Sequence, residues 1–292
     1  MKPALRLGLL ALLLALAACS PRQLILQETA TALATQGQAP EDDLVLAREA
    51  SAFYLKLSES VLHETPGHVP LTVAVTSGYT QYAYAFVQFD ADRLDAKDAQ
   101  AAQKLRQRAA RLYQRAQDHA MATLELHSPG LTKALANPAP AMWPRLPTDQ
   151  VDLAYWAAAS WGAYIALSKD QPQVVADLPL AMHLAQLAYA RAPQNKRGSL
   201  ASLMGTFEAA RPGGSAQRAV DYFDEAIGLD GRVSAAAYVA KAEAIALPAG
   251  DRPAFESLLK QALVTSATHP DLSNSVMRER ALWLLDNTDD LF

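Results

Sequence analysis

Cysteine is almost absent from this sequence, and so is any surplus of positive charge. Cys19 is the only cysteine among 292 residues, so no disulfide can form within one chain. The net charge is −4, which gives no general attraction to nucleic acid. Runs of β-branched residues are few while alanine is abundant, and this balance favours helices over strands.

The N-terminal segment has the layout of an export signal. Lys2 and Arg6 precede an apolar run from Leu7 to Ala18, whose twelve residues are too few to span a bilayer. Small residues then lead to Cys19, an arrangement that resembles the bacterial lipoprotein box. We therefore predict a signal peptide at residues 1–18 and a lipidated tether at residues 19–40, with room for one short helix that docks on the body. An ordinary secretory signal with an incidental cysteine is the alternative.

Lipidation would set the location of the mature chain. Two or more acyl chains on Cys19 give stable membrane anchoring. Ser20 follows the cysteine where lipoproteins kept at the inner membrane carry Asp, so the resemblance implies the outer membrane, facing the periplasm. Cleavage would remove Lys2 and Arg6 and no acid, which moves the net charge from −4 to −6. We expect contact with the membrane through the anchor only and no binding of nucleic acid.

The stretch from Leu153 to Lys169 predicts the central helix of the body. Its residues are apolar or small on every side, and a helix that is apolar all round is buried all round. Gly162 and several alanines allow neighbouring helices to approach closely. Before it, the periodicity predicts helices at about 44–63, 70–94 and 96–127, and a proline-rich loop at 129–149 that holds one short helix.

Two of these helices have a defined apolar face. The first carries Leu46, Ala50, Phe53, Leu57 and Val61 on one side. The third carries a basic run, which we interpret as a solvated face. Its apolar stripe consists of Leu105, Ala109, Leu112, Ala116 and Ala120.

The C-terminal half repeats. Similar four-residue segments end at Ala190, Ala226 and Ala262, an offset of 36 residues each time, and further helices at about 199–210, 234–247 and 271–286 follow them. Helix pairs at this period resemble tetratricopeptide (TPR) repeats. We predict an all-α fold, a TPR-like solenoid of about ten to twelve helices in stacked antiparallel pairs, as a single domain over residues 41–292.

The candidate catalytic and metal-binding motifs in the sequence each lack a required feature. His63 and His68 are five residues apart, and Pro66-Gly67 would break the helix that a zinc-protease motif needs. Ser160 lacks the first glycine of a nucleophile elbow and follows no strand. We expect no enzyme activity, no metal and no cofactor.

The aromatic residues are better candidates for a binding site. Those we select, with one small neighbour, are Tyr79, Tyr82, Phe86, Trp156 and Ser160. Core packing explains them, and so does an aromatic-lined cavity for an apolar or organic-acid ligand. We expect Trp156 to lie near the helix of Tyr82 and Trp161 to face the repeats.

Several segments together resemble the TRAP-transporter-associated T component (TatT-like) lipoproteins. They are Tyr79 to Gln88, Tyr155 to Gly162, Leu167 to Asp170, Val175 to Pro179 and the C-terminal tail from Arg280. The chain departs from the family in a shorter acidic segment at Glu41-Asp42-Asp43 and in Gln171, where a second acid is usual.

The resemblance implies a non-enzymatic helical lipoprotein that forms a trimer. Its partner would be the periplasmic solute-binding protein of a tripartite (TRAP) transporter, and its role the capture or transfer of a small organic or hydrophobic ligand. A general lipoprotein scaffold for envelope assembly is one alternative. A helical lytic enzyme is another, although no glutamate stands out as its catalytic acid.

Overall fold

The computed structural model describes residues 21–36, 43–192, 194–229 and 232–292, and these contain helices and no strands. The signal peptide and Cys19 lie outside the described residues. When each π-helical segment is counted with the helix it continues, eleven described helices have seven or more residues. The all-α prediction of packed helix pairs is confirmed. The principal elements are α2 (Pro21–Gln36), α3 (Leu44–Glu64), α4 (Val69–Tyr82), η1 (Ala83–Gln88), α5 (Phe89–Leu94), α6 (Ala99–His127), α8 (Val151–Ala166), α10 (Leu178–Arg191), α11 (Gln194–Ala210), α12 (Ala216–Leu229), α13 (Ala236–Lys241), η4 (Ala242–Ala246), α14 (Arg252–Thr268) and α15 (Leu272–Asp286).

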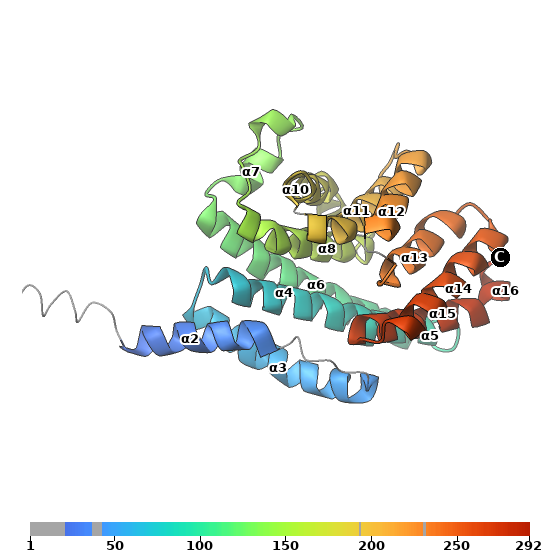
Figure 1. Ribbon diagram of the computed structural model, residues 1–292, viewed down its shortest axis with the longest axis horizontal. Helices are drawn as coiled ribbons and strands as arrows, with labels where there is room; N and C mark the ends of the chain where they lie inside the picture. The colour runs from blue at the N-terminus through green and yellow to red at the C-terminus, as the bar shows by residue number, and fades with distance from the viewer. Residues whose placement is uncertain (1–20, 37–42, 193, 230–231) are drawn as a thin grey trace, which may run out of the picture.

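Helix α8 is the centre of the body, as its uniform apolar sequence predicts. It packs against α4, α6, α10 and α11, and Figure 1 shows it between the N-terminal helices and the repeats. The side chain of Phe207 on α11 lies directly over Gly162, where an added Cβ would be 2.8 Å from the ring. Gly162 therefore permits the close approach. No described helix combines the length and hydropathy that crossing a membrane requires.

The N-terminal helices form a layered bundle, with α2 and α3 along the lower edge of Figure 1 and α4 and α6 above them. Asp43 caps α3 by accepting hydrogen bonds from the backbone N–H groups of Val45 and Leu46. Helix α2 packs against α3 and α4, so most of the segment predicted as a tether is a helix docked on the body.

The apolar face assigned to α3 points mainly to solvent. Phe53 is 74% exposed and Leu46 is 51% exposed. The opposite face is buried instead, and it includes Ser58 and Glu59. The predicted inward face of α3 is wrong because it assumed that Glu59 stays in water. Glu59 is 1% exposed, and a charged partner on a neighbouring helix offsets the free-energy cost of burying its carboxylate. The stripe predicted on α6 is buried or half-buried along its length, as expected.

The predicted helix at 70–94 is continuous but not uniform. Its middle, η1, is π-helical, and a second π segment, η4, continues α13. The loop before α8 holds the expected short helix, α7 (Leu131–Leu135), followed by two 3-10 turns, η2 (Pro140–Met142) and η3 (Thr148–Gln150). Two further short helices are α9 (Pro172–Val175) and α16 (Thr288–Leu291).

The C-terminal half consists of the helix pairs α10–α11, α12–α13 and α14–α15. The 36-residue register holds between the last two pairs, since Ala226 and Ala262 are both fully buried. In the first pair it holds in part: Leu187 is buried like its counterparts Phe223 and Leu259, but Ala190 is exposed and Ala188 is the buried alanine. Helix α10 packs onto α8 as well as α11, and this second contact selects a different face.

Candidate binding site

The aromatic residues singled out on α4 and η1 lie together. The rings of Tyr82 and Phe86 meet edge to face, with centroids 5.6 Å apart. The guanidinium of Arg48, on α3, lies 5.3 Å from the Phe86 ring centre. Tyr79 lies one turn earlier, is 4% exposed, and donates a 3.1 Å hydrogen bond to Glu59 Oε2. Tyr79 is therefore engaged in the interior.

Trp156 and Ser160 lie elsewhere on α8. The Ser160 hydroxyl is fully buried and donates to the carbonyl oxygen of Trp156 at 2.8 Å. The half-buried Trp156 ring packs against Tyr155, with centroids 4.8 Å apart. Trp156 does not pack against the hydrophobic cluster of η1 and α6 that Tyr82 and Tyr84 contact. The side chains that reach it from α8 and its C-cap are Ala163, Tyr164 and Leu167.

Glu59 forms a buried polar centre that the sequence analysis did not identify. Its carboxylate accepts hydrogen bonds from Arg115, from Lys56 Nζ at 2.7 Å and from Tyr79, and lies 2.7 Å from His119 Nε2. Burial alone would raise the pKa of Glu59, but the hydrogen bonds from Arg115, Lys56 and His119 hold it well below its usual value. The arrangement joins α3, α4 and α6 through charge.

Arg280 of α15 forms a second polar centre, where α15 meets α5 and η4. Its side chain is 11% exposed and reaches Asp92 Oδ2 at 2.6 Å and Glu243 Oε1 at 2.5 Å. Nearby, burial and the carboxylates of Glu243 and Asp92 raise the pKa of Tyr84 above its usual value, and Arg280 opposes them. Since Tyr84 belongs to η1 and Glu243 to η4, the two π segments contribute to the same place.

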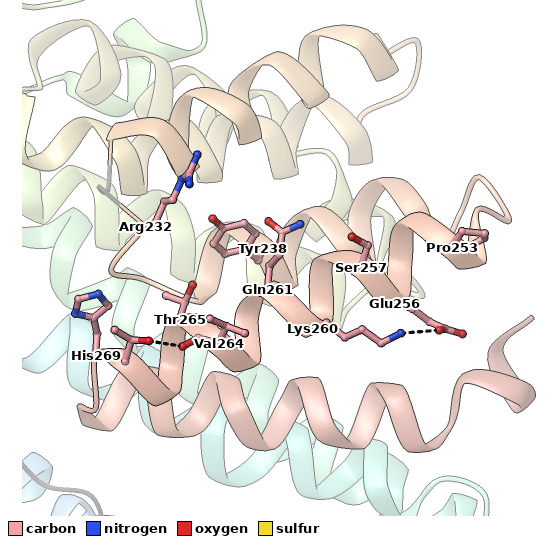
Figure 2. Close-up of a pocket in the computed structure, with 11 residues that line it drawn as sticks. Arg232, Tyr238, Pro253, Glu256, Ser257, Lys260, Gln261, Val264, Thr265 and His269 are labelled. Atoms are coloured by element: carbon pink, nitrogen blue, oxygen red, sulfur yellow. Dashed lines mark hydrogen bonds and ion pairs between the residues drawn. The ribbon is translucent and has the colours of Figure 1, made fainter.

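A hollow lies on the last repeat. Its volume is about 750 Å³, and it runs along α14 (Figure 2). One wall consists of the α14 residues Pro253, Ser257, Gln261 and Thr265, at four-residue intervals. Tyr238 of α13 and Arg232 of the preceding connection contribute the other side. We call this hollow the α14 groove.

A smaller hollow of about 320 Å³ includes Phe86. Its other walls come from α3, from Arg93 on α5 and from α15, so it lies beside the Arg280 junction. The two arginines that line it are already paired: Arg48 with Asp90 at 2.9 Å and Arg93 with Glu279 at 3.0 Å. Among the described residues, no three His, Cys, Asp or Glu side chains are grouped to hold a metal ion.

Comparisons with known proteins identify the family of this chain. The family model described as TRAP transporter T-component matches residues 40–292. A protein of Treponema pallidum (strain Nichols), described only as uncharacterized, is 28% identical over 266 residues, which cover 86% of this chain and 81% of that protein. The matched family is one of transporter components and not of enzymes. The chain belongs to the TRAP transporter T-component family.

Proposed function

We propose that this chain is a periplasm-facing lipoprotein that associates with the solute-binding protein of a TRAP transporter. In this role it helps to capture or hand over a small organic or hydrophobic ligand, held to the outer membrane through Cys19 and assembled as a trimer. The family match over the whole helical body from residue 40 carries the proposal.

The start of the described structure is compatible with an anchor at Cys19. Helix α2 begins at Pro21, two residues after that cysteine, and docks on α3 and α4. A lipid on Cys19 would therefore hold the body close to the membrane rather than on a long flexible linker. The candidate ligand-contacting residues in this proposal are Tyr79, Tyr82, Phe86, Trp156 and Ser160. Within the described residues, the side chains of Tyr79 and Ser160 form buried hydrogen bonds, whereas the rings of Tyr82, Phe86 and Trp156 do not.

The proposal is tested by affinity capture in the native envelope. A tagged TRAP solute-binding protein from the same genome should recover this chain from detergent-solubilised membranes. Cys19→Ala should move the chain into the soluble periplasmic fraction without preventing its recovery by the tagged partner, which separates anchoring from recognition. Failure to recover either form would contradict the association, and recovery of envelope-assembly proteins instead would favour the scaffold function.

A further inference from the structure

We propose that the α14 groove binds an extended acidic peptide segment of a partner protein. The side chains of Ser257, Gln261 and Thr265 follow one another along the same face of α14, as Figure 2 shows. Tyr238 and the guanidinium of Arg232 lie across from them. The groove therefore presents a line of hydrogen-bonding groups that ends in a cation.

Two of these groups are hydroxyls without a protein partner on side chains that are otherwise largely buried. Tyr238 is 5% exposed and Thr265 is 7% exposed, yet neither hydroxyl is hydrogen-bonded within the described residues. Two other hydroxyls on the same helix are paired with its backbone: Thr268 donates to the Val264 carbonyl at 2.8 Å and Ser266 to the Leu263 carbonyl at 3.0 Å. Both residues line the groove, and their accessible hydroxyls have no partner within the described residues, so they are available to hydrogen-bond a ligand that lies there.

The charges of the groove favour a ligand that carries carboxylates. Its acidic residue, Glu256, is already paired with Lys260 at 3.1 Å and with Arg252 at 3.0 Å. Arg232 is exposed at the groove and forms no ion pair with an acidic residue among those that the structure describes. Its φ of 61° lies in the left-handed region, which is costly for a residue other than glycine and is found preferentially at functional sites.

The length of the groove selects a peptide over a small organic acid. Helix α14 has 17 residues, which corresponds to about 25 Å at 1.5 Å per residue. About seven residues of extended chain span that distance. Backbone N–H and C=O groups of such a segment match the amide of Gln261 and the free hydroxyls. Val264, which is 67% exposed, offers an apolar contact. The inference does not require the partner to be a solute-binding protein.

A phage-displayed library of random heptapeptides, selected on the purified mature chain, tests the proposal. We expect enrichment of peptides with Asp or Glu clustered at one end. Arg232→Gln should weaken a selected, synthesised heptapeptide roughly tenfold or more, as loss of a charged hydrogen-bonding partner does. Arg111→Gln, which removes an exposed arginine from α6, should leave its affinity unchanged.

A double variant tests the contribution of the hydroxyls separately from that of the Arg232 charge. Tyr238→Phe with Thr265→Val removes both free hydroxyls and breaks no hydrogen bond within the described chain, so the melting temperature should not fall while affinity drops at least about fivefold. Peptides without acidic enrichment, or affinity retained in both groove variants, would overturn the proposal. So would succinate or a dipeptide that binds as tightly as the heptapeptide.

Discussion

At the scale of single residues, buried charge decides how the N-terminal bundle packs. Glu59 is 1% exposed and lies among groups from α3, α4 and α6. Removing one member of a buried charged network leaves the other members buried without a partner. The resulting loss of folding free energy exceeds the net stabilisation that the intact network provides. Glu59 is therefore the position where a conservative substitution should have the largest effect on this bundle.

Glu59→Gln should lower the free energy of unfolding by about 3–5 kcal/mol at neutral pH. The folded state depresses the pKa of Glu59 below its usual 4.5. Its stabilisation is therefore complete at higher pH and is lost as the pH falls below about 4.5. Urea unfolding of both proteins from pH 7 to pH 3 should show the difference shrinking with acid.

The matched control for Glu59 is Glu64→Gln. Glu64 pairs with Arg22 at 2.7 Å, but both side chains are at least half exposed, so its loss should cost less than about 1 kcal/mol. A difference between wild type and Glu59→Gln that stays constant with pH would show that the carboxylate's charge is not the stabilising feature.

The two tryptophans of α8 should respond differently to truncation. Trp161 is 4% exposed in the main core, so Trp161→Ala should cost about 3–5 kcal/mol. Trp156 is only half-buried, so Trp156→Ala should cost clearly less and instead weaken ligand or partner binding. Thermal unfolding together with partner affinity separates these effects. Normal binding by a severely destabilised Trp156→Ala protein would remove the case for a binding role.

At the scale of the helices, small residues determine how closely the pairs approach. Ala226 is fully buried in the contact between α12 and its neighbours, while Ala190 is exposed on α10. Ala226→Leu should therefore overpack the contact and cost about 1–3 kcal/mol, and Ala190→Leu should change stability by less than about 0.5 kcal/mol. Equal melting temperatures for the two variants would contradict the register seen in the structure.

The hydrophobic periodicity of the sequence predicts the positions of most helices. It does not predict which face of a helix is buried where that depends on residues distant in sequence. The helix of Leu153 to Ala166 is recognisable because nothing on its surface is polar enough to remain in water. The inward side of α3 is not, because Glu59 becomes suitable for the interior only once α6 supplies Arg115 and His119. The α14 groove has the same limitation, since Tyr238 and Thr265 come from different helices and their free hydroxyls have no signature in sequence.

At the scale of the whole molecule, the C-terminal helices return to the N-terminal bundle. Helix α15 packs against α3, and Arg280 bridges Asp92 of α5 and Glu243 of η4. Residues separated by almost 190 positions are thus joined by a largely buried ion pair. The bundle and the repeats should therefore unfold as one cooperative unit.

Arg280→Met tests this coupling. It leaves two carboxylates without their cation, so we expect a loss of about 2–4 kcal/mol and faster hydrogen exchange in α14 and α15 than in α6. Arg22→Met, at a side chain 75% exposed, is the control and should cost less than about 1 kcal/mol. Uniform exchange across all helices in Arg280→Met would contradict a localised role for this residue in joining the two halves.

The central claim is association with a TRAP solute-binding protein, and an equilibrium titration of the two purified proteins tests it most directly. Isothermal titration of the partner into the mature chain carrying Cys19→Ala, with and without the transported ligand, should give saturable binding at a fixed stoichiometry. An acidic mature chain without its lipid has no general affinity for proteins of similar charge, so saturation would indicate a specific interface. Heats indistinguishable from dilution in both conditions, with each protein folded, would contradict the account.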